Sequence, residues 1–120
     1  MGTFEVSARV FSMDGVQRVD VTMLVDTGAT FSLLPAEVLR GLGVQEQLQV
    51  ETEYATGQVK TVAVGLAMME IEGFPERVPV LIAFGRETAR PLLGAHALEA
   101  FRLSVDPVGQ ALRPVRAYLR

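Results

Sequence analysis

Hydrophobic and polar residues alternate along the first part of the chain, a pattern typical of β-strands with one buried face. The alternation runs from Thr3 to Phe11, stops at a turn signal in Asp14-Gly15, and resumes from Val19 to Met23. This pattern predicts an N-terminal hairpin. At Leu24-Val25 two apolar residues follow one another, so we expect the end of the second strand to be buried on both faces.

The remainder of the chain reads as a series of short strands with few helices. Pro35 is expected to open a helix of one to two turns that ends at Gly41, and the Ala-rich and Leu-rich segment 95–101 is the clearest helix. The expected strands are Phe31–Leu34, a hairpin over Leu48–Val64 with its turn at Ala55-Thr56-Gly57, Gly65–Ile71, Val78–Phe84, Leu103–Asp106 and Ala111–Leu119. The pattern predicts a mostly all-β, barrel-like domain with one or two short helices.

Length and composition narrow the class of protein. The chain has 120 residues, 49% of them apolar and 21% charged, so we expect a single globular domain over residues 1–120. The net charge is −3 and the arginines are scattered, which argues against nucleic acid or a polybasic membrane contact as partner. No signal peptide or membrane-spanning stretch is evident, and a cytoplasmic protein is expected.

The residue types in the chain also argue against cysteine chemistry, metal binding and histidine-based catalysis. The chain has no cysteine, which excludes a thiol nucleophile, a disulfide and an iron–sulfur cluster. Asp14, Asp20 and Asp106 fall on separate turns and strands without a metal-binding spacing, so we expect no metal and no cofactor. The single histidine, His96, has no accompanying Ser or Cys nucleophile motif, and we expect it to be a helix-terminal residue.

The segment Leu24-Val25-Asp26-Thr27-Gly28-Ala29 is the best candidate for catalysis. It places a carboxylate at the end of a strand that is expected to be buried, where an ionised group needs a charged or hydrogen-bonding partner. Gly28 permits a tight turn and lets backbone amides approach the carboxylate. Taken alone, the Asp-Thr-Gly tripeptide fits an ordinary strand-end turn equally well.

A second segment makes the pattern more specific. Pro91-Leu92-Leu93-Gly94 lies downstream and leads directly into the predicted helix. With this pair of segments the chain resembles the retropepsin-like, or retroviral-type, aspartic proteases and in particular their single-domain bacterial relatives. The resemblance covers most of the chain, including a flap-like hairpin at about Glu51 to Val62, and it implies a retropepsin-like acid-protease β-barrel.

The resemblance implies a symmetric homodimer. Aspartic proteolysis uses two carboxylates that share a proton, one as base toward water and one as acid toward the peptide carbonyl. This chain has one Asp-Thr-Gly, and a two-lobed enzyme with a second copy would need about twice the length. Two copies of Asp26 would therefore meet at a two-fold axis, and the family's termini would pair in one sheet, here residues 1–5 with 115–119.

Residue roles follow from the same resemblance. Asp26 would be the catalytic acid and base; Thr27 would hydrogen-bond across the dyad, Gly28 would contact the substrate backbone, and Ala29 would lie beside the carboxylates. The substrate would be an extended segment of a peptide or protein. The flap would comprise Tyr54, Ala55, Thr56 and Gly57, and the expected apolar lining of the substrate groove is Phe31, Leu33, Val80, Ile82 and Leu92.

The chain departs from the viral pattern at one ion pair. Viral enzymes place Arg after the glycine that corresponds to Gly94 and an acid after the Asp-Thr-Gly-Ala loop. Here Ala95 and Thr30 stand at those two positions, so both partners are missing together, and the flap tip also lacks the several glycines of viral flaps. Two alternatives therefore stay open: a catalytically silent dimer that binds peptides, and an unrelated β-barrel in which Asp-Thr-Gly is only a turn.

Overall fold

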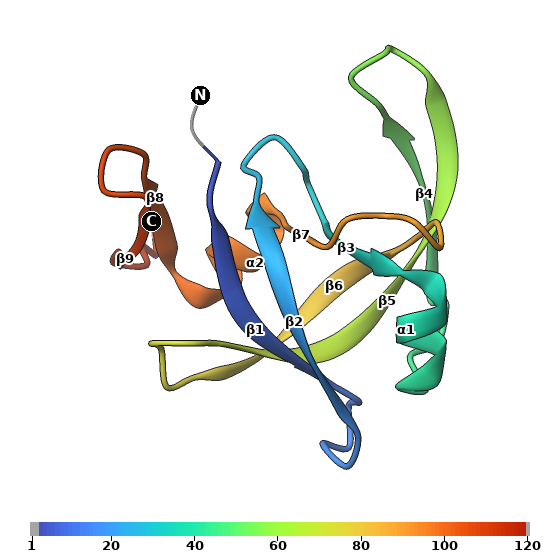
Figure 1. Ribbon diagram of the computed structural model, residues 1–120, viewed down its shortest axis with the longest axis horizontal. Coiled ribbons are helices and arrows are strands. Elements are labelled where there is room, and N and C mark those ends of the chain that lie inside the picture. The colour runs from blue at the N-terminus through green and yellow to red at the C-terminus, as the bar shows by residue number, and fades with distance from the viewer. Residues whose placement is uncertain (1–2, 120) are drawn as a thin grey trace.

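The computed structural model describes residues 3–119, which form nine strands and two short helices (Figure 1). In chain order the elements are β1 (Glu5–Phe11), β2 (Arg18–Val25), β3 (Ser32–Pro35), α1 (Ala36–Gly41), β4 (Leu48–Glu53), β5 (Val59–Ile71), β6 (Arg77–Gly85), β7 (Leu92–Leu93), α2 (Ala95–Phe101), β8 (Leu103–Asp106) and β9 (Ala111–Pro114). The prediction of a mostly-β fold with one or two short helices is confirmed.

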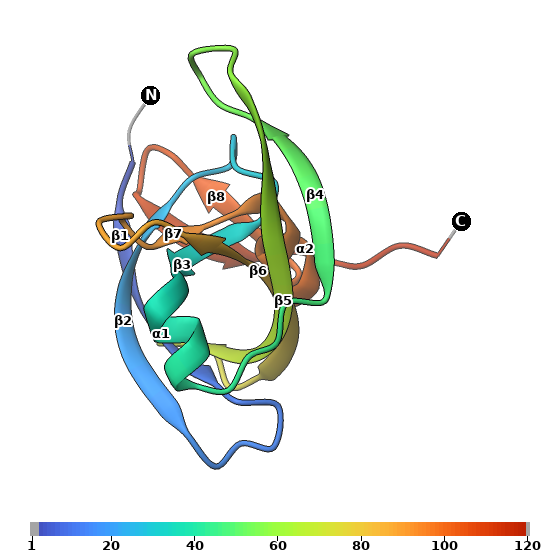
Figure 2. The same cartoon turned by 90° about the vertical axis from the view of Figure 1, so that its right-hand side faces the viewer.

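Seven of the strands form one sheet that closes on itself. The strand order is β1-β2-β7-β3-β6-β5-β4, and β1 also pairs with β5. Strands β8 and β9 form a separate two-stranded sheet. The long strand β5 makes the closure possible because its first part pairs with β4 and its last part pairs with β1. The β4–β5 hairpin consequently projects from the closed part of the sheet, as Figures 1 and 2 show.

The predicted N-terminal hairpin is confirmed. β1 and β2 pair antiparallel, and Gly15 adopts the left-handed conformation that the turn between them requires, with φ of 76°. The hydroxyl of Ser12 donates to Asp14 at 2.6 Å, and the same carboxylate accepts the amide of Val16 at 3.0 Å. These two hydrogen bonds hold the pKa of Asp14 below its usual value.

Two expected strand boundaries are wrong. Glycine at position 65 suggested a break, yet β5 runs unbroken from Val59 to Ile71. The glycine serves close packing instead, because a Cβ there would collide with the carbonyl oxygen of Gln45. The last strand ends at Pro114, the amide of Val115 donates to the carbonyl of Arg102 at 2.8 Å, and the chain beyond it leads away from the body (Figure 2). The expected pairing of the two termini involves residues 1–2, which lie outside the described residues.

The hydrophobic core fills the inside of the closed sheet and is capped by α2. It contains Met23, Leu34, Met69, Ile82 and Leu93, all fully buried. From α2, the side chains of Ala97, Leu98 and Phe101 enter the same cluster. Burial of one such side chain contributes about 1.5–3 kcal/mol, so the core fixes the strand ends from which the functional loops start.

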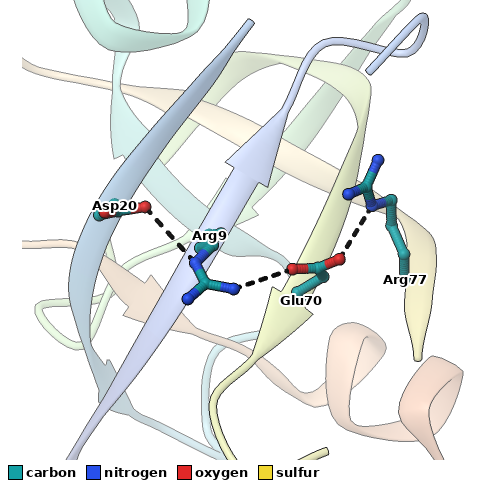
Figure 3. Close-up of polar contacts among 4 residues, drawn as sticks. All are labelled: Arg9, Asp20, Glu70 and Arg77. Carbon is teal, nitrogen blue, oxygen red and sulfur yellow. Dashed lines mark hydrogen bonds and ion pairs between the residues drawn. The ribbon is translucent and has the colours of Figure 1, made fainter. Parts of the chain in front are cut away.

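Where the sheet closes, side chains of negative and positive charge alternate across four neighbouring strands. Arg9 of β1 lies between Asp20 of β2, 3.8 Å away, and Glu70 of β5, 3.3 Å away, and Arg77 of β6 binds the other oxygen of Glu70 at 3.0 Å (Figure 3). Each of these pairs lies directly opposite in the strand register. The Arg77 guanidinium also stacks 3.8 Å from the centre of the Phe11 ring. A register shift at the closure would break all of these contacts at once.

We expect Glu70 to make the stability of the fold sensitive to acid. The hydrogen bond from Arg77, assisted by Arg9, lowers the pKa of Glu70 from its ordinary value of 4.5. A lowered pKa stabilises the folded state above the unfolded pKa, and this contribution is lost as the pH falls through the folded pKa. The free energy of unfolding, measured with urea from about pH 7 to about pH 3, should therefore depend less steeply on pH in Glu70→Gln than in the wild type.

Glu72→Gln provides the matched control, because Glu72 is exposed and lies two residues further along the chain. Its pH dependence should equal that of the wild type. Equal slopes for Glu70→Gln and the wild type would contradict the prediction.

Candidate active site

The loop that carries Asp26 follows directly from the end of β2. The amide of Asp26 donates to the carbonyl of Leu93 at 3.0 Å, which extends the pairing of β2 with β7. The chain then turns, because the carbonyl of Asp26 accepts the amide of Ala29 at 3.2 Å. The amide of Gly28 donates to Asp26 Oδ1 at 2.9 Å. A carboxylate that accepts a backbone amide is held in one orientation. The hydrogen-bonding partner that the sequence analysis required for Asp26 is therefore the turn itself.

The Asp26 loop is attached to the start of α2 by backbone hydrogen bonds. The amide of Ala95 donates to the carbonyl of Ala29 at 2.7 Å, and that of His96 donates to Thr30 at 3.0 Å. The rings of Phe31 and His96 pack beside these bonds with their centres 5.8 Å apart. The two segments that the sequence analysis paired, Asp26–Ala29 and Leu92–Gly94, are thus in direct contact.

Gly94 permits this contact. A Cβ on Gly94 would lie 2.5 Å from the carbonyl oxygen of Phe31 and 2.8 Å from that of Ala29, closer than real Cβ atoms approach backbone. The amide of Gly94 donates to the hydroxyl of Ser32 at 3.1 Å, and Ser32 is fully buried. Sequence reasoning missed Ser32. A serine in an otherwise apolar strand could have indicated it, since a buried hydroxyl needs a hydrogen-bond partner.

The candidate dyad residues differ in exposure. Asp26 and Ala29 are partly buried, whereas Thr27 and Gly28 are exposed at the crest of the loop. The side chains that would face a second copy are therefore accessible in the single chain. No group of three or more His, Asp or Glu side chains within residues 3–119 is placed to hold a metal ion.

The predicted flap residues lie at the tip of the β4–β5 hairpin. The amide of Tyr54 donates to Gln58 at 2.8 Å, the amide of Gly57 donates to Tyr54 at 2.8 Å, and Gly57 has a φ of 86°. Tyr54, Ala55, Thr56 and Gly57 are all exposed. In both views the tip and the loop after β2 rise on the same side of the molecule (Figures 1 and 2).

A row of apolar residues crosses the sheet between the Asp26 loop and the hairpin, and we call it the cross-sheet row. Residues directly opposite on paired strands share a face. Successive pairs in the register define the row as Leu24, Leu92, Leu33, Ala83, Val64 and Leu48. None of the six belongs to the core cluster, whereas their chain neighbours Val25, Leu34 and Leu93 do, although Val64 and Ala83 of the row are also buried. The row therefore lies on the face opposite the core, and Asp26 follows two residues after its first member.

This row corrects the expected lining of the substrate groove. Leu33 and Leu92 lie in it and are half-buried, and Phe31 is half-buried at the end of the Asp26 loop. Val80 and Ile82 do not line a groove on this face, because they are 3% and 0% exposed and belong to the core cluster. Every residue of β6 from Val80 to Phe84 is apolar, so alternation could not indicate which face each side chain takes.

A surface hollow of about 450 Å³ lies elsewhere, on the outer side of β1, β2 and β5. Arg9, Asp20 and Glu70 line it, and both carboxylates already pair with Arg9. The hollow does not include Asp26, and these three charged side chains already have partners. The candidate site is therefore the Asp26 loop and not this hollow.

Comparison with known proteins agrees with this placement. Residues 13–100 match the family described as "gag-polyprotein putative aspartyl protease". The chain belongs to this family. The matched region contains the Asp26 loop, the β4–β5 hairpin and Gly94. A search of curated protein sequences gives no match.

The fold of this family member is similar to that of a solved bacterial protein. The crystal structure of a retropepsin-like aspartic protease from Rickettsia conorii superposes with a TM-score of 0.53 and 22% sequence identity, covering 88% of this chain and 85% of the other. The resemblance to the retropepsin-like family is thereby confirmed. No helix within residues 3–119 is long and apolar enough to cross a membrane.

We predict that the contact at Gly94 is required for the fold around Asp26. Gly94→Ala should lower the free energy of unfolding by about 1–3 kcal/mol, because the added methyl group meets two rigid carbonyls. Urea unfolding monitored by circular dichroism measures this change. Gly41→Ala is the control: no atom lies within 4 Å of its added Cβ, so the replacement in helix α1 should be neutral or stabilising. Equal stability of the two variants would contradict the prediction.

Proposed function

We propose that this chain is an aspartic endopeptidase that hydrolyses extended peptide segments as a symmetric homodimer. The observation that supports it most directly is the Asp26 turn, in which the carboxylate is oriented by the Gly28 amide on a loop hydrogen-bonded to β7 and α2. Membership of a family of aspartyl proteases supports the reaction class. The second carboxylate that the reaction needs would come from another copy of the chain.

In the proposed mechanism the two Asp26 carboxylates share one proton. The ionised carboxylate takes a proton from a water molecule, which attacks the peptide carbonyl carbon, and the protonated one donates its proton to the carbonyl oxygen. Collapse of the tetrahedral intermediate breaks the C–N bond and returns a proton to the leaving amine. Two carboxylates that lie side by side repel one another when both are ionised, so the singly protonated pair is favoured.

The neighbouring residues take roles around this dyad. Thr27, exposed at the crest of the loop, would hydrogen-bond to the opposite subunit, and Gly28 would let the substrate backbone approach. The flap tip, Tyr54 to Gly57, would close over the peptide and exclude water. Leu33 and Leu92, two partly exposed members of the cross-sheet row, would receive apolar side chains together with Phe31.

The absence of the viral-type ion pair is compatible with this proposal. Thr30 and Ala95 occupy the two positions. Backbone hydrogen bonds from the amides of Ala95 and His96 to the carbonyls of Ala29 and Thr30 join the two segments there. These bonds hold the loop against α2 without charged side chains. We therefore favour an active enzyme over a silent peptide-binding dimer, which the following experiment distinguishes.

Replacing Asp26 by asparagine should abolish proteolysis while leaving the fold intact. An unfolded protein substrate and a peptide library, incubated with the purified chain from mildly acidic to neutral pH, should be cleaved by the wild type, and the Asp26→Asn variant should lose at least about 10³-fold in kcat/KM. Circular dichroism checks that the variant folds. Cleavage that persists in Asp26→Asn would exclude Asp26 as the catalytic acid, and a folded but inactive wild type would indicate the silent dimer.

Mixing subunits tests whether one active site needs two chains. When wild type and Asp26→Asn are refolded together in equal amounts, about a quarter of the dimers contain two intact carboxylates. Activity should then fall to about a quarter of that of the same total amount of wild-type chain. Chains that act alone would keep about half. Refolding wild type with Glu72→Gln should leave the activity unchanged.

A further inference from the structure

The inner face of the flap hairpin can be assigned from strand register. Side chains on alternate residues of a strand share a face, so Lys60 and Val62 share the face of Val64, which belongs to the cross-sheet row. On β4, Thr52 lies directly opposite Lys60 and Val50 lies opposite Val62. The face that carries the row beside the Asp26 loop thus continues along the hairpin to Lys60.

Lys60 differs from most cations in the chain. It is the only lysine, and it is partly buried although it lies close to the exposed hairpin tip. Six arginines form ion pairs, but no carboxylate within residues 3–119 lies within 4.0 Å of the Lys60 ammonium. Instead, its nitrogen lies 5.7 Å from the centre of the Tyr54 ring. An aromatic ring at this distance attracts the ammonium but carries no charge that would neutralise it.

The carboxylates nearest in sequence lie on the other face of the hairpin. Glu51 and Glu53 pair with Thr61 and Val59, and all four are exposed. On the inner face, the hydroxyl of Thr52 donates to the carbonyl of Lys60 at 3.2 Å, which holds the two strands together beside the ammonium. The inner face near the tip therefore combines one positive charge, one aromatic ring and no carboxylate of the hairpin.

From this arrangement we propose that Lys60 is a specificity-determining residue that selects peptides with an acidic side chain in the segment covered by the flap. The inference rests on the proposed function, because it takes the inner face of the hairpin as the substrate-facing one. The apolar row receives apolar side chains near the scissile bond, and Lys60 pairs with a Glu or Asp side chain further along the peptide. In a homodimer two copies of Lys60 would act, one from each flap.

The test measures binding and cleavage separately. The probes are fluorescent, extended peptides that are neutral except for a single Glu, which is placed at each position in turn. In the control peptides Gln replaces the Glu. The affinity of each peptide for the Asp26→Asn protein is measured by fluorescence anisotropy. At the favoured positions the Glu peptide should bind roughly five- to tenfold more tightly than the Gln peptide. The preference should weaken as the salt concentration rises.

Variants at position 60 assign the preference to the lysine. In the Asp26→Asn background, Lys60→Met should remove it, Lys60→Arg should keep it, and Lys60→Glu should favour a peptide with Lys at the same position. Arg18→Gln removes a positive charge at the opposite end of β2 from Asp26 and should leave the preference unchanged. Lys60→Arg also controls for folding, since it retains the charge.

The outcomes separate this inference from the proposed function. An unchanged Glu-to-Gln ratio in Lys60→Met, equal affinity at every position, or no binding of any peptide would each overturn the role of Lys60. A Lys60-dependent preference in binding together with no cleavage by the chain with Asp26 intact would overturn the endopeptidase and leave the Lys60 assignment standing. With both correct, the same Glu-over-Gln preference appears in kcat/KM and is lost in Lys60→Met.

Discussion

The candidate site depends on the backbone contact between the Asp26 loop and the segment that ends at Gly94. The amides of Asp26, Ala95 and His96 donate across this contact to the carbonyl oxygens of Leu93, Ala29 and Thr30, at 2.7–3.0 Å. The contact requires glycine at position 94, because two carbonyl oxygens occupy the space of a Cβ. Because three hydrogen bonds of about 0.5–1.5 kcal/mol each hold it, the loop has little freedom to adopt another conformation.

The same contact connects the core with the face that carries the cross-sheet row, through the two-residue strand β7. Leu93 is fully buried in the core cluster, and its neighbour Leu92 belongs to the cross-sheet row. Strand β7 pairs in parallel with β2 and antiparallel with β3. A rotation of this dipeptide would take Leu93 out of the core, so packing of the core determines which residue is presented beside Asp26. Short strands can therefore be as well defined as long ones when both neighbours pair with them.

Local features of this fold could be predicted from the sequence, and long-range features could not. The Asp14-Gly15 turn, helix α2 and the hairpin tip each depend on a few consecutive residues, so turn chemistry and helix propensity were sufficient. The unbroken strand β5 could not be predicted, because Gly65 is required by the distant carbonyl of Gln45. The burial of Val80 and Ile82 likewise depends on register with strands far away in the chain. The Asp26 and Gly94 segments were paired by resemblance, and their contact became visible only in the fold.

The backbone hydrogen bonds that hold the Asp26 loop also determine which side chains are available to bind a substrate. Because backbone amides fix the Asp26 loop, the side chains at positions 30, 31, 95 and 96 do not have to form an ion pair for the loop to keep its conformation. Phe31 and His96 stack there instead. Six arginines that pair with carboxylates do so at other places, mainly at the sheet closure and the turns. A positive charge on the inner face of the hairpin, as at Lys60, therefore has no carboxylate partner to lose when an anionic peptide arrives, and the energetic cost of binding comes from desolvating the ammonium and the peptide's carboxylate.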